Sequence, residues 1–363
     1  MKKNHEYYMS IAKRLALKAK GRTSPNPMVG ALVVKRGRIV GRGYHKKCGL
    51  AHAEVEALDA AGTLSKGASL YVTLEPCTHF GKTPPCVDRI IKSGISEVIV
   101  GMLDPNPLNN GKGIHILRQN KIKVLVGVLE EDLRKLNEVF IKYITKKIPF
   151  VTVKVAESLD GKIATSRGDS KWITSDKSRF HAHRLRQDYD AVMVGVNTVL
   201  RDNPRLDAWF SSRQPMKIIV DSQLSTPRDA NVFAAKSKPI VVTLSSRPGQ
   251  ETENRKMLSE KARILEVKEK EGQVNLRDMM KKLARLEITS ILVEGGGTLI
   301  GSLFDEVLVD KVIFFISPKI IGGKEAISSV MGKGIARIEQ AIKLKDVRWR
   351  RSGEDFLIEG YVK

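Results

Sequence analysis

The chain has 363 residues, 42% of them hydrophobic, and a formal net charge of +23 at pH 7. At about 150 residues per domain, this length predicts two domains, each with enough apolar residues for its own core. No apolar run approaches the roughly 18 residues that a membrane span needs, so we expect a soluble, cytoplasmic protein without a membrane partner.

The positive charge raises the possibility of a nucleic-acid partner, because clustered Lys and Arg side chains bind phosphate backbones. Here the basic residues are scattered, runs such as 348–351 are short, and aromatic residues make up only 6% of the chain. We therefore expect no nucleic-acid partner. The charge is better interpreted as a solvated surface that attracts phosphorylated small molecules.

In the N-terminal part, short apolar segments alternate with helical ones, which is typical of an α/β domain. The turn signal K35-R-G-R38 predicts a hairpin between the first two strands. The predicted strands cover residues 29–34, 39–43, 69–74, 97–101 and 123–127, and the predicted helices cover 52–61, 87–93, 112–119 and 130–146. A basic stretch at 146–149 marks a boundary, so we predict domains at 1–147 and 148–363.

The second part also alternates strands and helices, which predicts a mixed or mostly parallel sheet covered on both faces. Apart from one strand, the segment 227–274 is polar and gives no clear prediction. The predicted strands cover 150–156, 190–195, 217–221, 239–243, 290–294 and 311–317, with a terminal pair near 347–350 and 356–362; the predicted helices cover 178–187 and 275–286.

Two motifs in the first domain carry metal chemistry: A51-H-A-E54 and E75-P-C-T-H-F-G-K-T-P-P-C86. One imidazole and two thiolates, from His52, Cys77 and Cys86, suit Zn²⁺ and leave a fourth tetrahedral position for water. Bound zinc lowers the pKa of water from about 16 to about 7, and Glu54 would then move the proton. The zinc-dependent deaminases of nucleobases carry this pattern. A structural zinc site, or unrelated Cys and His residues, is the alternative.

Cysteine usage agrees with a reducing compartment, because the chain has only three cysteines and two of them belong to the metal motif. Cys48 has no partner at ligand spacing, so we expect a free thiol there.

The second domain contains L292-V-E-G-G-G-T-L-I-G301, a predicted strand that leads into a glycine cluster and then a predicted helix. Backbone amides at such a helix start can approach a phosphate closely. The spacing fails the dinucleotide-binding fingerprint because Gly301 comes one position late. A tight turn without a ligand is an equal alternative.

Taken in order, these motifs resemble those of the bifunctional deaminase/reductases of riboflavin biosynthesis, over almost the full length of the chain. The resemblance rests on S24-P-N-P-M-V-G30, H52-A-E54, the cysteine loop, D104-P-N-P107, K154-x-A-x-S-L-D-G161, the stretch from Thr198 to Pro204, and E294-G-G-G297.

The resemblance implies a cytidine-deaminase-like zinc domain fused to a dihydrofolate-reductase-like domain that uses NADPH. The first domain would hydrolyse the 2-amino group of 2,5-diamino-6-ribosylamino-4(3H)-pyrimidinone 5′-phosphate. The second would reduce the ribosyl side chain of that product to a ribityl phosphate. We also expect a homo-oligomer.

The resemblance further assigns roles to individual side chains. Without it, Asn26 and Asn106 would be interpreted as turn residues, and Arg186 as part of a solvated helix face. The implied substrate contacts are Asn26, His45, Lys82 and Asn106 in the deaminase and Lys154, Ser170, Arg186, Leu206 and Glu294 in the reductase. The implied NADPH contacts are Ala156, Trp172, Thr174, Thr198, Asp202, Ser222, Gly296, Gly297 and Thr298.

The chain departs from the family pattern at Trp209, where the family usually has an arginine that contacts the substrate. An indole has one donor and no charge, so it cannot replace a guanidinium on phosphate. Arg205 or Arg213 could compensate. We predict a raised KM for the reductase step, and an active deaminase with an impaired or redirected reductase is an alternative function.

Two other classes of protein are weighed against this prediction. A nucleic-acid deaminase separates its two cysteines by two residues, whereas residues 78–85 intervene here. That longer loop can reach over a small substrate. A binding protein with a relict zinc site is opposed by the intact Glu54.

Overall fold

The computed structural model describes residues 4–80, 84–209, 213–234, 238–245 and 253–363. The chain divides into two compact units, residues 1–147 and 148–363, and each has its own hydrophobic core. Within the described ranges, no helix is both long and apolar enough to cross a membrane.

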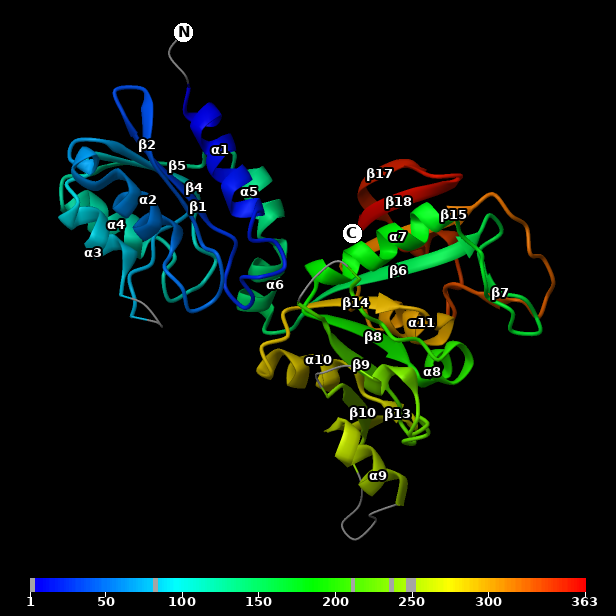
Figure 1. Cartoon of the computed structure of the whole chain (residues 1–363). Coiled ribbons are helices and arrows are strands. Elements are labelled where there is room, and N and C mark those ends of the chain that lie inside the picture. The colour runs from blue at the N-terminus through cyan, green and yellow to red at the C-terminus, as the bar shows by residue number, and fades with distance from the viewer. Residues whose placement is uncertain (1–3, 81–83, 210–212, 235–237, 246–252) are drawn as a thin grey trace. The chain divides into compact units, whose positions relative to one another are not determined.

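The first unit is built on a five-stranded sheet with the order β2-β1-β3-β4-β5 (Figure 1). The hairpin partners β1 and β2 are antiparallel, as the turn signal predicted, and β3, β4 and β5 run parallel. The strands are β1 (Gly30–Lys35), β2 (Arg38–Tyr44), β3 (Ser69–Leu74), β4 (Glu97–Met102) and β5 (Lys123–Val126).

Helices cover both faces of this sheet. Glycines permit the closest approaches, because a Cβ at Gly30 would meet Ala12 O of α1 at 2.1 Å and a Cβ at Gly43 would meet Ala53 O of α2 at 2.2 Å. In Figure 1, α1, α5 and α6 lie on one side of the sheet, and α2, α3 and α4 on the other. The helices are α1 (His5–Leu17), α2 (Ala53–Ala61), α3 (Cys86–Lys92), α4 (Lys112–Gln119), α5 (Glu130–Leu136) and α6 (Glu138–Lys146).

Two features of the first unit differ from the sequence prediction. The helix α1 was not predicted, although Tyr8, Met9 and Ala12 bury its inner face. The single helix predicted at 130–146 was wrong, since Asn137 interrupts it between α5 and α6 with φ −105° and ψ 23°. The Asn137 amide instead accepts a hydrogen bond from Met28 N at 2.8 Å and donates one to Met28 O at 3.1 Å.

The second unit contains a nine-stranded sheet with the order β11-β10-β9-β8-β14-β6-β15-β18-β17. It is parallel from β11 to β15 and antiparallel only at β18 and β17, so the predicted mostly parallel sheet is confirmed. The strands are β6 (Phe150–Ser158), β8 (Ala191–Gly195), β9 (Met216–Val220), β10 (Ile240–Leu244), β11 (Arg263–Val267), β14 (Ser290–Glu294), β15 (Lys311–Ser317), β17 (Leu344–Ser352) and β18 (Asp355–Val362).

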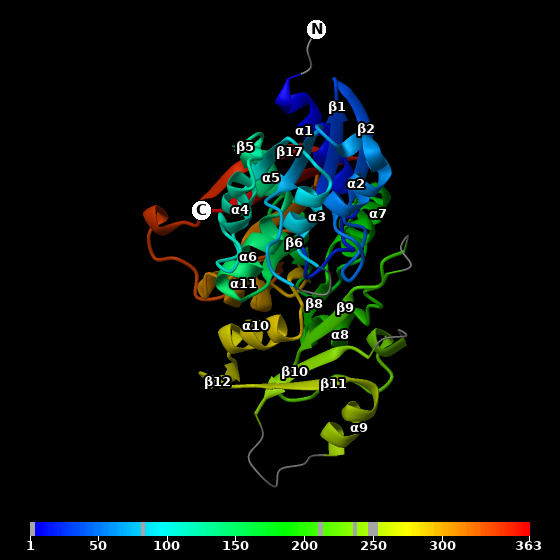
Figure 2. The same ribbon diagram turned by 90° about the vertical axis from the view of Figure 1, so that its left-hand side faces the viewer.

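Alternate side chains of the central strands enter different cores, as the two-residue period of a strand requires. In β8, Ala191 and Met193 pack with α10 and α11, whereas Val192 and Val194 pack with Val199 of α8 and Leu258 of α9. Figure 2 shows α10 and α9 with the strands β10 and β11 between them. The helices are α7 (Asp176–Leu185), α8 (Val196–Asp202), α9 (Glu253–Lys261), α10 (Leu276–Arg285) and α11 (Gly297–Asp305).

The segment that gave no clear prediction contains α9, β11 and the short pair β12 (Glu269–Lys270) and β13 (Gln273–Val274). Its one predicted strand, at 239–243, corresponds to β10. The helix α9 is difficult to predict because Leu258 is its one fully buried residue and polar side chains surround it.

Candidate active sites

Three potential metal ligands meet at the ends of elements in the first unit. His52 lies at the N-cap of α2, Cys86 is the first residue of α3, and Cys77 follows β3. Their ligand atoms all lie within 4.8 Å of one another. Within the part of the chain that the structure describes, this is the one such group of His, Cys, Asp and Glu side chains.

The spacing of these atoms fits a zinc ion. His52 Nδ1 lies 3.2 Å from Cys86 Sγ and 3.6 Å from Cys77 Sγ. Tetrahedral zinc, with bonds of about 2.1 Å to nitrogen and 2.3 Å to sulfur, would place such ligand atoms roughly 3.6 Å apart. The Cys86 amide also donates to Cys77 Sγ at 3.4 Å, and the hydrogen bond from the Cys86 thiol lowers the pKa of Cys77 to about 4. A thiolate is the form that binds metal.

Glu54 lies in the first turn of α2, two residues after the potential ligand His52, and is only 4% exposed. Burial and the neighbouring Cys77 raise the pKa of Glu54 to about 7. A carboxyl group in this range can both accept and release a proton near neutral pH. The Glu54 carboxyl group can therefore exchange a proton beside the three potential ligands.

His45 and Asn26, both predicted substrate contacts, lie next to each other beside this group. His45 Nε2 is 3.1 Å from Asn26 Nδ2, and the His45 ring meets the His52 ring edge-on at 5.3 Å between centroids. The hydrogen bonds between Met28 and Asn137 fix the loop that contains Asn26. The structure thus brings Asn26, which belongs to the motif S24-P-N-P-M-V-G30, close to the potential ligand His52.

Two buried polar residues that were not predicted from the sequence hold the cysteine loop. The Glu75 carboxylate accepts hydrogen bonds from the backbone amides of residues 104, 111, 113 and 114 at 2.9–3.3 Å. Asn109 accepts from Thr78 N at 3.0 Å and donates to Asp104 Oδ2 at 3.1 Å. Glu75 begins the cysteine motif, and Asn109 follows the motif D104-P-N-P107. Their contacts join segments about 30 residues apart, which the spacing of residues within a motif does not reveal.

The other two predicted deaminase contacts are less direct. Asn106 supports a turn, because its Oδ1 accepts a hydrogen bond from Leu108 N at 3.1 Å, as the turn interpretation of P-N-P anticipates. Its role toward substrate stays a prediction. Lys82 lies outside the described residues.

The second unit contains a cavity of about 490 Å³ that gathers most of the predicted reductase residues. It lies beside β6 and the end of β14, where α7 with the loop before it and the loop after α8 meet them. All five predicted substrate contacts line it: Lys154, Ser170, Arg186, Leu206 and Glu294. Six predicted cofactor contacts line it as well: Ala156, Trp172, Thr174, Thr198, Asp202 and Gly296.

A buried ion network forms one wall of this cavity. Arg186 grips Glu294 with two hydrogen bonds, Nε to Oε1 at 2.6 Å and Nη2 to Oε2 at 3.0 Å, and Lys154 Nζ lies 3.6 Å from Oε2. Burial alone would raise the pKa of Glu294, but Arg186 and Lys154 outweigh it and lower that pKa to about 2. Arg186 is 9% exposed, so it is not part of a solvated helix face, and its fork is directed at a carboxylate of the protein itself.

Trp209 lines the cavity and stacks on His183, with ring centroids 3.5 Å apart. Its loop is anchored at Asp207, whose carboxylate meets the buried Lys217 at 2.8 Å and Arg205 at 2.8 Å. Of the two arginines considered as substitutes, Arg205 lines the cavity. The other, at position 213, is paired with Asp190 at 2.5 Å and is not among the lining residues.

A second cavity of about 440 Å³ adjoins the first, since Thr198 and Gly296 line both. It receives two further predicted cofactor contacts, Ser222 and Thr298. The glycine turn between β14 and α11 separates the two cavities, and Gly296 has φ 81°, a value that favours glycine. Gly297 lines neither cavity. It packs closely against the backbone of Ser328 instead, since a Cβ at Gly297 would meet Ser328 O at 2.3 Å.

Comparison with known proteins agrees with both sites. Residues 2–102 match the family model of the cytidine and deoxycytidylate deaminase zinc-binding region, and residues 149–358 match that of the RibD C-terminal domain. The riboflavin biosynthesis protein RibD of Aquifex aeolicus is 49% identical over 354 residues, covering 97% of this chain and 96% of that protein. The RibD of Escherichia coli is 37% identical over 96% of this chain and 97% of its own length.

Solved structures give the same result over the whole chain. The deaminase/reductase of Thermotoga maritima superposes with a TM-score of 0.86 at 40% identity, covering 99% of this chain and 98% of that one. Acinetobacter baumannii RibD gives a TM-score of 0.88 at 32% identity with the same coverage. The predicted resemblance, fold class and zinc-binding deaminase domain are thereby confirmed. The chain belongs to the RibD family of riboflavin biosynthesis proteins.

Proposed function

We propose that the chain is a bifunctional enzyme of riboflavin biosynthesis. Residues 1–147 deaminate 2,5-diamino-6-ribosylamino-4(3H)-pyrimidinone 5′-phosphate, and residues 148–363 reduce the ribosyl side chain of the product with NADPH. The observation that carries this proposal is the His52, Cys77 and Cys86 group with Glu54 beside it, on a chain that also carries the reductase cavity. A phosphorylated pyrimidine is the common ligand of both sites.

In the deaminase, His52, Cys77 and Cys86 would hold zinc. The chemistry that zinc supplies is the acidification of a water at neutral pH. Glu54 takes the two protons of the attacking water in turn: it gives one to the neighbouring ring nitrogen as the oxygen adds to the ring carbon, and one to the amino group as the C–N bond breaks and ammonia departs. Asn26 and His45 orient the pyrimidine, because they stand together at the edge of the ligand group.

In the reductase, the chemistry that NADPH would supply is a hydride for the anomeric carbon, which the opened sugar presents as an imine. Thr198 and Gly296, which line both cavities, are among the residues that would hold it. Lys154 supplies the accompanying proton to the imine nitrogen. Its amino group faces the cavity beside Glu294, and burial lowers the pKa of Lys154, which makes proton release easier.

The test is a paired assay on the full-length, zinc-loaded protein with the diaminopyrimidinone ribosyl phosphate. Ammonia release is followed without NADPH, and NADPH oxidation is then followed by its near-ultraviolet absorbance. We expect both signals in sequence. Ammonia release without NADPH oxidation would support the alternative of an impaired reductase, which the Trp209 departure motivates. The absence of both signals would refute the proposal.

The remaining expectations about partners are part of the same proposal. Undetectable deamination of oligonucleotides by the zinc-loaded protein would support a small-molecule substrate over a nucleic acid. The homo-oligomer and the cytoplasmic location stay predictions, and sedimentation of the purified protein tests the first of them.

A further inference from the structure

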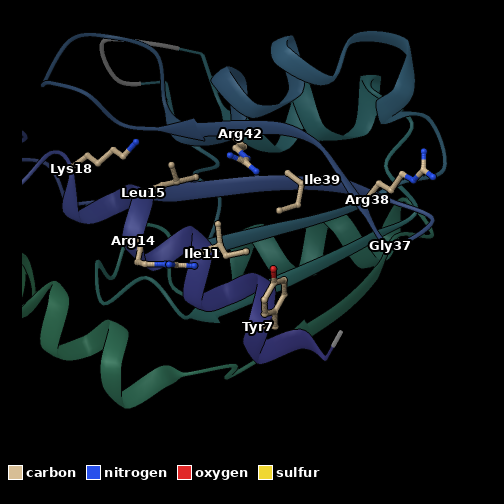
Figure 3. A pocket seen from close by; sticks show the side chains of 9 residues that line it. All are labelled: Tyr7, Ile11, Arg14, Leu15, Lys18, Gly37, Arg38, Ile39 and Arg42. Atoms are coloured by element: carbon tan, nitrogen blue, oxygen red, sulfur yellow. The ribbon is translucent and has the colours of Figure 1, made fainter. Parts of the chain in front are cut away.

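A groove of about 700 Å³ lies between α1 and β2 in the first unit (Figure 3). Residues of α1 form one side of it, and residues of β2 with Gly37 form the other. None of its lining residues belongs to the metal-ligand group or to the predicted substrate contacts. The lining consists of Tyr7, Ile11, Arg14, Leu15, Lys18, Gly37, Arg38, Ile39 and Arg42.

Local geometry explains why these side chains share one surface. On α1, the spacing from Tyr7 through Ile11 and Arg14 to Lys18 follows one helical stripe, which is about 16 Å long. On β2, the pairing with β1 shifts register between residues 39 and 41. This bulge brings Ile39 and Arg42 to the same side of the strand. Figure 3 shows these two side chains facing α1 across the groove.

The groove combines an apolar floor with an unbalanced charge. Ile11, Leu15 and Ile39 are half-buried, whereas its four cations, Arg14, Lys18, Arg38 and Arg42, are exposed. No carboxylate lines the groove, and within the described ranges none of these four cations makes an ion pair. By contrast, the neighbouring Lys13 on another face of α1 is paired with Asp132 at 2.6 Å.

The strand that borders the groove is also an edge strand. In the described sheet β2 pairs only with β1, so the outer backbone groups of β2 have no strand beside them. Such an edge can accept an added strand from another chain, with main-chain hydrogen bonds for affinity and side-chain pockets for specificity. Side chains of an added strand would enter the groove at every second position.

From this combination we propose that the groove binds an acidic, extended segment of a partner protein, which adds a strand to the edge of β2. Acidic and apolar residues alternate among the side chains that enter the groove, so that the acidic ones meet its cations and the apolar ones cover Ile11, Leu15 and Ile39. A groove about 16 Å long accommodates roughly five residues of extended chain. This binding surface is separate from both active sites, so it does not depend on the proposed function.

A protein segment fits better than a nucleic acid. Single-stranded nucleic acids bind surfaces on which several aromatic rings stack with bases, and the groove contains one, that of Tyr7. Its floor is aliphatic, which suits Val or Leu side chains. A second copy of the chain is disfavoured, because its net charge of +23 opposes docking onto four cations.

The proposal is tested with the fluorescein-labelled heptapeptide Glu-Ser-Val-Ser-Glu-Ser-Val, which puts both Glu and Val side chains on one face of an extended strand. Binding to the full-length protein is measured by fluorescence anisotropy at low salt. Arg14→Glu combined with Arg42→Glu should weaken binding about tenfold or more, because two attractions become repulsions. Lys92→Glu with Lys123→Glu changes the net charge equally at exposed positions on α3 and on the opposite edge strand β5. It should alter binding by no more than about twofold.

Strand addition has its own readout. N-methylation of one alternate set of peptide amides should abolish binding while methylation of the other set preserves it, since only every second amide faces β2. If the charge reversal impairs folding, Arg14→Gln with Arg42→Gln replaces it. Equal losses in groove and control variants, or equal effects of both methylation patterns, would overturn the proposal. Two further outcomes would also overturn it. One is that the groove variant loses binding of a single-stranded RNA more strongly than binding of the peptide. The other is that the groove variant has a changed oligomeric state.

Discussion

Glu54 combines two properties at a single residue: it follows the metal ligand His52 in the first turn of α2, and burial raises its pKa to about 7. We expect Glu54→Gln to keep the metal and to lower the kcat of ammonia release by about 10²–10⁴. Metal content by atomic spectroscopy and the deaminase assay check this together. Reductase activity on the deaminated substrate serves as the control. Retained deamination would remove Glu54 from its proposed role.

Trp209 is the second residue whose effect can be measured. We expect Trp209→Arg to lower the KM of the reductase for its phosphorylated substrate about tenfold with little change in kcat, because a guanidinium can grip phosphate. Trp209→Phe is the matched control, since it keeps a ring for stacking on His183 without adding charge. An unchanged KM in the arginine variant would mean that other residues bind the phosphate.

At the residue scale, the sequence reveals candidate metal-binding residues better than the buried residues that fix the loops around a site. The grouping of His52, Cys77 and Cys86 was predictable, because metal chemistry restricts candidate ligands to few residue types at short spacings. Glu75, Asn109 and Lys217 were not, although each is buried and fixes a loop of a site. Glu75 and Asn109 contact segments about 30 residues away along the chain, and Lys217 contacts Asp207 in the loop that precedes its strand. A buried Lys217 on β9 in particular follows no period that distinguishes it from a surface lysine.

Among the elements, the break between α5 and α6 shows how a side chain can override a helical pattern. Asn137 is 2% exposed, and its side-chain amide makes two hydrogen bonds with the backbone of Met28. We expect Asn137→Ala to lower the free energy of unfolding of the first unit by about 1–3 kcal/mol, because Met28 N and O lose their partner in a buried position. Urea denaturation measures this. Asn110→Ala, at an exposed position, should have little effect.

The network of Glu294, Lys154 and Arg186 joins β14, β6 and the end of α7, and it gives a pH dependence. The pKa of Glu294 is lowered from 4.5 to about 2 in the folded protein. Its ionised form therefore stabilises the fold above about pH 4.5, by on the order of 3 kcal/mol, and this contribution is lost as the pH falls toward 2.

Denaturation of the wild type and of Glu294→Gln at pH 7 and at about pH 3 tests this dependence. The difference in unfolding free energy between the two proteins should shrink at the lower pH. Glu339→Gln, at an exposed position, is the control and should show no such trend. A difference that is the same at both values would contradict the lowered pKa.

Element types were largely predictable because strands and helices alternate with clear periods, and the strands of the two large sheets, except β11, were expected close to where they lie. The exceptions are informative. The helix α1 buries Tyr8, Met9, Ala12 and Ala16 but also carries Ile11 and Leu15 on its groove side, so its apolar residues do not form one narrow stripe and the helical pattern is weak. The order β11-β10-β9-β8-β14-β6-β15 could not be predicted, because it depends on pairings between strands far apart in the chain.

The whole molecule consists of two units with separate cores and separate candidate sites. We expect removal of zinc by a chelator to abolish ammonia release and to leave NADPH oxidation unchanged when the deaminated substrate is supplied. The reason is that the ligands all belong to the first unit. Readdition of zinc should restore the first activity. Parallel loss of both activities would show that the reductase depends on the metal domain.

The strand order of the second unit also decides when each half of the chain can fold. The strand β6 is the first to follow the boundary, yet both of its neighbours, β14 and β15, come from residues beyond 289. The first unit completes its sheet with residues before 148. On the ribosome the metal domain can therefore reach its native state early, while β6 must wait for nearly the whole chain to be synthesised. During that interval an apolar strand of the reductase is without partners, and a premature stop in translation would release a folded deaminase attached to an unfolded tail.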